Sequence, residues 1–284
     1  AISAEETDYL LKVVNEHFKQ QLSRGDVLHS FAGVRPLCDD ESDEPSAITR
    51  DYTLSLSGTP GEAPLLSVFG GKLTTYRIMA QDAVDLALGE EEAQKRPSIT
   101  DRTLLHGADG VFGLRARIPL LLEELRAGSQ DPEIWTEQRL NDLIARYGSD
   151  LHAVLALIQE DPSLERPLEG APVHLRAEIV HAARAEGVVH LDDVIERRTR
   201  LSTEVRDRGV AAAEEIASLV APELGWNEER IAGEIRGYKS LVAARLRGET
   251  AHDDVTAAGA LAAPWVSSAA RAQGQYPTRT VTII

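Results

Sequence analysis

The stretch LLSVFGGKLTTYR, residues 65–77, decides how the first third of the chain folds. Its apolar run 65–69 is typical of a β-strand, and an amphipathic pattern begins after the two glycines, which predicts strand, turn and helix. Gly70 and Gly71 tolerate positive φ and carry no Cβ, so the backbone there can approach another group closely. Unpaired amides of the first helical turn near Thr74, together with the helix dipole, favour negative charge. A tight turn that binds nothing is the alternative interpretation.

The sequence around this stretch predicts a small α+β arrangement. Ser3 and Glu6 have the spacing of a capping box, and apolar residues recur at helical spacing over residues 4–23. Residues 27–34 and 48–56 have the composition of strands. The second of these is expected to form a hairpin with the strand before the two glycines, through a turn rich in glycine and proline.

The helix that follows the two glycines is expected over residues 73–88. Its apolar residues are spaced so that they form one stripe, which we expect to be buried. The stripe consists of Leu73, Tyr76, Met79, Ala80, Ala83, Val84 and Ala87.

The composition narrows the class of protein. With 284 residues, 43% of them hydrophobic, the chain is long enough for two domains. Its formal net charge of −16 disfavours nucleic acid and electrostatic anchoring to anionic lipid, so an anion site has to be local. The single cysteine, Cys38, excludes an intrachain disulfide. No apolar run has the length of a membrane-spanning helix, and the first residues lack the basic start of a signal peptide.

The acid-rich run CDDESDE, residues 38–44, is interpreted as a solvated loop. Its carboxylates lack the ligand spacing and the glycine of an EF-hand, so no metal site is predicted.

Two arginines, Arg35 and Arg50, lie at the ends of predicted strands, where both could project toward the same sheet end as Gly70 and Gly71. A guanidinium group matches the geometry of phosphate or carboxylate through two parallel hydrogen bonds. A pair of surface ion pairs with neighbouring acids is the alternative.

Beyond residue 113 the sequence changes to helical segments separated by glycine or proline. They predict an all-α domain over residues 114–250, with six or seven helices. A linker over 91–113, including the loop GADGVFG, joins it to the first region, residues 1–90. The Ala-rich tail over 251–284 is expected to be loosely ordered.

The helical region carries two groups of titratable residues. His174 and His181 are seven residues apart, too far along a helix to share a metal ion, and are interpreted as structural or solvated. For the second group, the sequence leaves open a buried network that docks this domain on the preceding region or a solvated helix pair. That group consists of Glu186, Asp192, Asp193, Arg197 and Arg198.

Three motifs, GVRPL (33–37), TRDY (49–52) and SVFGGKLTTYR (67–77), resemble in order and spacing the flavin-dependent, quinone-linked glycerol-3-phosphate dehydrogenases. The likeness continues more weakly through ARYGSD (145–150) and VVHLDDVIERRTRLS (188–202), which are similar to the helical C-terminal domain of that family. The resemblance implies an α+β fragment of an FAD-dependent oxidoreductase followed by an all-α C-terminal domain.

The resemblance also implies an activity: glycerol 3-phosphate gives a hydride to FAD, becomes dihydroxyacetone phosphate, and the electrons pass to a quinone. Arg35 and Arg50 fall on family arginines that bind the substrate. The cofactor-binding positions fall on Gly70, Gly71, Lys72, Leu73 and Thr74. Reduced flavin carries negative charge around N1 and O2, which a helix N-terminus and a nearby lysine would stabilise.

The general base is not assigned by these motifs. His29 is the histidine nearest to them, but it lies inside a predicted strand, where a core or edge role is the simpler interpretation.

The chain departs from the family in one respect: none of its predicted strands is followed by G-x-G-x-x-G, the cradle for the ADP half of FAD. Together with a first residue that is Ala, this predicts a C-terminal portion that is inactive by itself. The rival interpretations are a glycerol-3-phosphate oxidase that uses O2 and a non-catalytic helical module for interaction or oligomerisation. A cytoplasmic location is expected, and peripheral attachment to the cytoplasmic membrane and homo-oligomer formation stay open.

Overall fold

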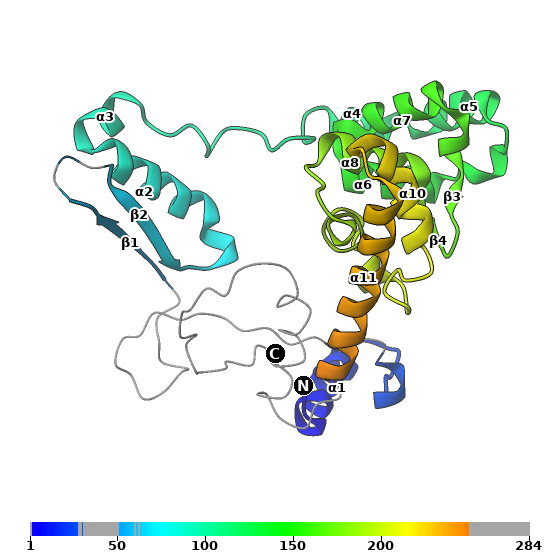
Figure 1. Ribbon diagram of the computed structural model, residues 1–284, viewed down its shortest axis with the longest axis horizontal. Helices are drawn as coiled ribbons and strands as arrows, with labels where there is room; N and C mark the ends of the chain where they lie inside the picture. Colours follow the sequence, from blue (N-terminus) through cyan, green and yellow to red (C-terminus); the bar gives the residue numbers. More distant parts are fainter. Residues whose placement is uncertain (1, 28–29, 31–50, 60, 62, 250–284) are drawn as a thin grey trace. The chain divides into compact units, whose positions relative to one another are not determined.

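The computed structural model describes residues 2–27, 30, 51–59, 61 and 63–249. Its elements form three groups along the chain, an N-terminal helix, a hairpin with helices, and a helical region (Figure 1). The first two groups contain α1 (Ala4–His17), η1 (Arg24–Asp26), β1 (Tyr52–Ser57), β2 (Leu65–Gly70), η2 (Leu73–Thr75), α2 (Tyr76–Leu88) and α3 (Glu90–Lys95).

The helical region contains a longer series of elements, with one very short hairpin and one π-helix among them. They are α4 (Val111–Ala116), α5 (Ile118–Gly128), η3 (Pro132–Ile134), α6 (Glu137–Tyr147), η4 (Gly148–Asp150), α7 (Leu151–Glu160), η5 (Pro162–Glu165), β3 (Pro167–Leu168), β4 (Ala171–Leu175), α8 (Arg176–Ala185), the π-helix η6 (Asp193–Arg198), α9 (Leu201–Glu204), α10 (Ala213–Leu224) and α11 (Glu228–Glu249).

The N-terminal helix α1 begins with the predicted capping box. Glu6 N donates to Ser3 Oγ at 3.1 Å, and Ser3 N donates to Glu6 Oε2 at 2.7 Å. The helix ends at His17 rather than at residue 23, because the Asn15 side chain accepts from Leu22 N at 2.7 Å and donates to Leu22 O at 2.9 Å. These side-chain bonds replace helical ones and turn the chain back.

The predicted hairpin is confirmed: β1 and β2 pair antiparallel, from Tyr52 opposite Gly70 to Ser57 opposite Leu65. The helix predicted over 73–88 is also present, with its first turn as the 3₁₀ turn η2. Most of the strand predicted over 27–34 and the start of that over 48–56 lie outside the described residues.

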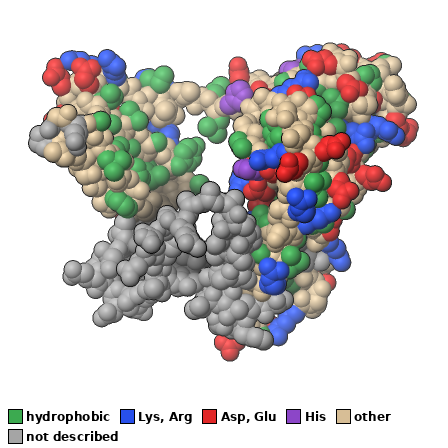
Figure 2. Space-filling view, in the orientation of Figure 1, with side chains coloured by type: hydrophobic (Ala, Val, Ile, Leu, Met, Phe, Trp, Pro, Cys, Tyr) green, Lys and Arg blue, Asp and Glu red, His purple; other side chains and the backbone are tan. Residues whose placement is uncertain are grey.

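The expected burial of the α2 stripe is wrong, since Leu73 is 88% exposed, Val84 56% and Tyr76 52%. None of the described residues between 51 and 106 is buried. Two strands offer too little surface to cover one face of a helix. Hydrophobic side chains are accordingly visible over the hairpin and α2 in Figure 2.

The helical region has a core in two parts that meet at α8. One part joins α4–α7 to Ala177 and Val180, and the other joins α10, α11 and the π-helix to Ile179 and Ala182. Because both parts use α8, every residue from 177 to 183 is buried. Any polar side chain in that span has to find its partners inside the protein.

The structure differs at three points from what was predicted for the linker and the all-α domain. β3 and β4 form a short antiparallel pair inside the domain predicted to be all-α. Part of the predicted loop GADGVFG starts α4, and the predicted linker contains α3. The remaining turn of that loop is pinned by a backbone contact, since Gly107 O accepts from Ser149 N at 2.9 Å. A Cβ at Gly148 would lie 1.9 Å from the same oxygen, so only glycine fits there.

Residues 192–201, which lie in the predicted all-α domain, form an irregular helical segment. Thr199 N donates to Val194 O at 2.9 Å, five residues back, which defines the π-helix. Arg200 follows with φ of 59°, and Arg208 has φ of 61°. Wide helical turns and left-handed non-glycine residues are strained and often mark functional segments. Among the helices of the described residues, none has the length and apolar character needed to span a bilayer.

Candidate functional site

The predicted glycine turn is present at the end of β2. Gly70 has φ of 71° and Gly71 has φ of 96°, both in the region that favours glycine. The chain thereby leaves the strand and enters η2 and α2 within a few residues. The local geometry predicted from residues 65–77 is correct.

Gly71 is also fixed by what surrounds it. A Cβ at this position would lie 3.0 Å from Met79 Sδ and 3.3 Å from Tyr52 Cβ. Met79 belongs to α2 and Tyr52 to β1, so the missing side chain lets helix and hairpin close on the turn. One helical turn further along α2, Asp82 accepts a hydrogen bond from the Tyr52 hydroxyl, which raises the pKa of Tyr52.

The start of the helix after Gly71 offers its polar groups outward. Lys72 and Thr75, which precede η2 and α2, make no side-chain cap to either element. Thr75 N and Tyr76 N already donate to Lys72 O and Leu73 O, so the amides that can meet a ligand are those of Leu73 and Thr74. Lys72 is about half exposed, with its Nζ 3.7 Å from Asp51 Oδ1. The turn therefore combines a positive helix end, an accessible lysine and an uncovered Leu73.

The structure does not test the predicted substrate arginines. Arg35 and Arg50 lie outside the described residues, as do His29 and the acid-rich run 38–44. Of the predicted site, the described residues bring together Gly70, Gly71, Lys72, Leu73 and Thr74. Within the described residues, no group of three or more His, Cys, Asp or Glu side chains is placed to hold a metal ion.

A buried polar centre in the helical region was missed by sequence reasoning. Glu178 of α8 has no exposed side-chain surface, yet it accepts from Arg146 Nε at 2.8 Å, Tyr147 Oη at 3.1 Å and Leu175 N at 2.8 Å. Burial alone would raise the pKa of Glu178, but the hydrogen bond from His174 and the charge of Arg146 outweigh it and lower the pKa. Glu178 is thus a fully paired carboxylate that joins α6, β4 and α8.

The histidine interpretation needs one correction. His174 lies on β4 and not on the helix of His181, so the two do not share a helix face. Both are buried, which confirms a structural role over a solvated one. His181 contacts the Tyr147 ring edge-on, with ring centroids 5.4 Å apart.

The charged group that was considered for domain docking is not buried within the helical region itself. Arg197 Nη1 lies 2.8 Å from Asp192 Oδ2 and 2.9 Å from Asp193 Oδ1, so it is paired within its own turn. Arg197 and Arg198 are both exposed. Docking of this domain on the preceding region through these two arginines stays a prediction.

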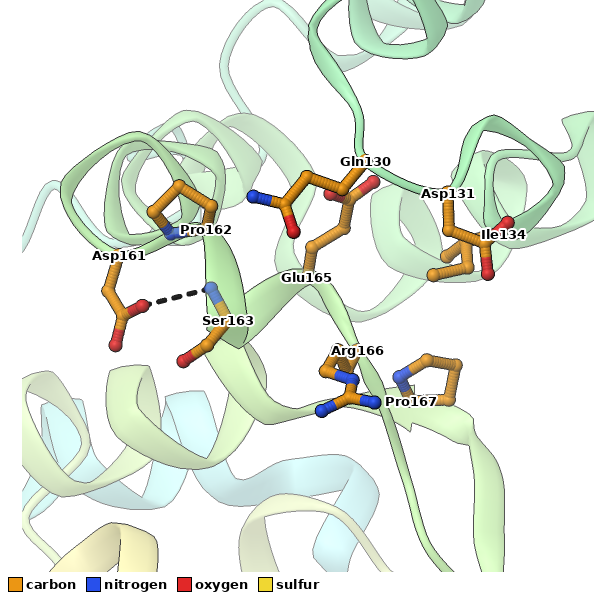
Figure 3. Close-up of a pocket in the computed structure, with 9 residues that line it drawn as sticks. All are labelled: Gln130, Asp131, Ile134, Asp161, Pro162, Ser163, Glu165, Arg166 and Pro167. Carbon is orange, nitrogen blue, oxygen red and sulfur yellow. Dashed lines mark hydrogen bonds between the residues drawn. The ribbon is translucent and has the colours of Figure 1, made fainter.

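A cavity of about 820 Å³ lies between the end of α5 and the η5 segment (Figure 3). Its polar lining residues make hydrogen bonds within the protein. Asp161 Oδ1 caps η5 by accepting from Ser163 N at 2.9 Å, and hydrogen bonds from Ser163 lower the pKa of Asp161. Glu165, which is 4% exposed, accepts from Trp135 Nε1 at 2.7 Å and from the Ser129 hydroxyl. These bonds hold η3 and η5 together, which is a structural task.

Residues 98–231 match the family described as the C-terminal domain of alpha-glycerophosphate oxidase. That match covers α4–α10 and gives the class of the helical region.

Particular relatives extend the comparison to the first third of the chain. The chain is 39% identical over 257 residues to a glycerol-3-phosphate dehydrogenase of Mycobacterium leprae (strain TN), an alignment that covers 90% of this chain and 42% of the relative. It is 50% identical over 131 residues to the aerobic glycerol-3-phosphate dehydrogenase of Escherichia coli (strain K12), an alignment that covers 44% of this chain and 26% of the relative. A D-erythritol 1-phosphate dehydrogenase of Brucella abortus (strain 2308) is 58% identical over 81 residues, which are 28% of this chain and 16% of the relative.

These relatives confirm the predicted resemblance to the glycerol-3-phosphate dehydrogenases, over their C-terminal portion. The chain spans 42% of the length of the Mycobacterium leprae protein, so the activity of the whole relative is not carried over by similarity alone.

Proposed function

We propose that this chain is the C-terminal portion of a flavoprotein that oxidises sn-glycerol 3-phosphate to dihydroxyacetone phosphate. In this proposal FAD accepts the hydride and a quinone accepts the electrons. The observation that carries the proposal is the 39% identity to a glycerol-3-phosphate dehydrogenase over 90% of the chain, which includes the glycine turn.

The glycine turn fits the polar edge of a reduced flavin. Gly70 and Gly71 both have positive φ, which lets the backbone turn from β2 to the helix start without a side chain of its own at either position. FAD, when bound, supplies the hydride acceptor, and its reduced ring carries negative charge at N1 and O2. The amides after Lys72 and the Lys72 ammonium would stabilise that charge.

The substrate would be bound by residues of the same region. In this proposal Arg35 and Arg50 hold the phosphate or the oxygens at the reacting carbon, because a guanidinium group binds such oxygens in pairs. Residues that cradle the ADP half of FAD would come from a dinucleotide-binding part of the protein, since this chain has no strand followed by G-x-G-x-x-G.

The first test concerns FAD retention. The 284-residue chain, mixed with FAD and passed over a gel-filtration column, is expected to elute without flavin absorption, because it holds half of a cofactor site. The comparison sample is a chimera in which this chain replaces the matching region of the Mycobacterium leprae dehydrogenase. The chimera is expected to retain FAD. A tightly held, reducible flavin on the isolated chain would contradict the half-site proposal.

Two neighbouring activities are supported by particular observations. The matched family is named for an oxidase, so electron transfer to O2 is a rival to quinone. Hydrogen peroxide release in air, measured on the chimera with glycerol 3-phosphate, distinguishes them. The D-erythritol 1-phosphate relative points to a longer polyol phosphate, and the same assay with that substrate decides between the two.

A non-catalytic role is the rival of a different class. Here the helical region would bind a partner protein or a second copy of the chain. Peripheral membrane attachment and self-association belong to this part of the proposal, and co-sedimentation with vesicles and the molar mass in solution test them. A chimera that folds, keeps FAD and does not respond to either polyol phosphate would favour this rival.

A further inference from the structure

Tyr52 connects the strand, the turn and the helix of the proposed flavin site. It begins β1 and lies opposite Gly70 in the register of the hairpin. Its Cβ lies 3.3 Å from the position that a Cβ of Gly71 would take. At the other end of the same side chain, the hydroxyl donates to Asp82 of α2. One side chain therefore contacts the glycine turn and the helix that follows it.

The surface on which α2 meets the hairpin is small. Tyr52 and Leu54 are the two partly buried residues of β1, and their spacing places them on one face of the strand. Met79 and Asp82, three residues apart on α2, are also partly buried and share one side of the helix. Because none of the described residues between 51 and 106 is buried, apolar packing holds α2 only weakly. The hydrogen bond between Tyr52 and Asp82 therefore has a large share in fixing α2 on the hairpin.

This hydrogen bond is of a stronger kind than the neighbouring ion pair. A hydroxyl that donates to an ionised carboxylate forms a charge-assisted bond, and both side chains are partly shielded from water. Asp51 and Lys72 are instead 77% and 51% exposed, with 3.7 Å between Oδ1 and Nζ, and exposed pairs of this kind contribute little to stability. Tyr52 and not Asp51 is thus the residue suited to hold the turn.

The group held in place is the helix start after Gly71. Thr75 N donates to Lys72 O at 3.0 Å, which closes the first turn and leaves the Leu73 and Thr74 amides for a ligand. Fixed N–H donors stabilise a developing negative charge only while they point at it. A tilt of α2 on the hairpin would turn these two amides away from that charge.

We propose that Tyr52 and Asp82 are positioning residues, which hold the start of α2 so that the Leu73 and Thr74 amides face the flavin and raise its reduction potential. Neither residue has to touch the cofactor or the substrate for this role. The inference rests on the proposed flavin site, and it adds the residues that tune that site.

The test measures the reduction potential of the flavin in the FAD-loaded chimera. Anaerobic titration with dithionite beside a reference dye gives the potential without any substrate. Tyr52→Phe keeps the ring and removes the hydroxyl, so we expect about a tenfold shift toward oxidised flavin, which is about 30 mV for a two-electron couple. Asp82→Asn keeps an oxygen that accepts from the hydroxyl and should stay near the parent chimera.

Two further variants separate the hydrogen bond from charge and folding. Asp85→Asn, one helical turn further along α2, is the control for loss of a carboxylate and should leave the potential near that of the parent. In Tyr52→Phe/Asp82→Ala the second substitution should add little to the first, because both remove the same bond. A parental potential in Tyr52→Phe, or fully additive shifts in the double variant, would overturn the positioning role.

A second measurement needs no flavin. In the 284-residue chain, the Thr75 amide is expected to exchange its hydrogen about tenfold faster in Tyr52→Phe and at nearly the wild-type rate in Asp82→Asn. Unchanged exchange in Tyr52→Phe would also overturn the positioning role. If both measurements agree with it while glycerol 3-phosphate fails to reduce the chimera, the proposed oxidation is contradicted and the positioning role is supported.

Discussion

Replacing Glu178 with alanine is expected to lower the free energy of unfolding of the helical region by about 3–5 kcal/mol, the range measured when one partner of a buried ion pair is removed. The variant leaves the Arg146 guanidinium, the Tyr147 hydroxyl and the Leu175 amide without their acceptor. Urea unfolding of the full chain, followed by far-UV circular dichroism, measures the change.

The contribution of Glu178 has a predictable pH dependence. Because the pKa of Glu178 is lowered in the folded protein, its stabilisation is present above the ordinary range of a glutamate, about 4.3, and is lost as the pH falls through the lower folded value. The free energies of unfolding of the wild type and of Glu178→Ala should therefore become more similar in acid. Glu160→Ala, at a glutamate that is 65% exposed, is the control and should change stability by less than about 1 kcal/mol. A loss of similar size in both variants would contradict the role of the buried centre.

The second large effect is expected at the glycine turn. Gly71→Val in the chimera should weaken FAD binding by about tenfold to a hundredfold, because strain of about 1–3 kcal/mol at this positive-φ position would shift the turn that is proposed to face the flavin. The added side chain would also meet Met79 Sδ and Tyr52 Cβ, which would push α2 away from the hairpin. Equilibrium titration of the apo-chimera with FAD, followed by quenching of flavin fluorescence, measures the affinity.

Gly61→Val is the matched control for this substitution. Gly61 has φ of 94°, close to the 96° of Gly71, but a Cβ there meets no described atom within 4 Å. The control shares the backbone strain without touching the proposed flavin edge, so its FAD affinity should stay near that of the parent chimera. Equal losses in the two variants would mean that Gly71 acts on folding and not on the cofactor.

Local geometry was predictable from the sequence where residue type dictates backbone. The capping box at Ser3 follows from spacing, and the turn at Gly70 and Gly71 follows from the φ values that only glycine adopts easily. The β1–β2 pairing follows from alternating strand residues on either side of a turn. Each of these depends on neighbours within a few positions along the chain.

Features that depend on distant partners could not be read in this way. The α2 stripe has the spacing of a buried face, but the described elements around it leave Leu73 and Val84 exposed. Glu178 looks like an ordinary surface glutamate until α6 brings Arg146 and Tyr147 beside it. The α8 sequence RAEIVHAARA carries four polar or charged residues, so it does not by itself predict that Glu178 is buried. The role of Arg35 and Arg50 stays a prediction.

The central claim is that this chain completes a glycerol-3-phosphate-oxidising flavoprotein. It is tested most directly by mixing the FAD-loaded chimera with glycerol 3-phosphate in the absence of oxygen and recording the flavin absorption band. We predict that the band bleaches and that one dihydroxyacetone phosphate forms for each flavin reduced. A folded chimera that holds oxidised FAD, is reduced by dithionite and keeps its band with glycerol 3-phosphate would contradict the claim.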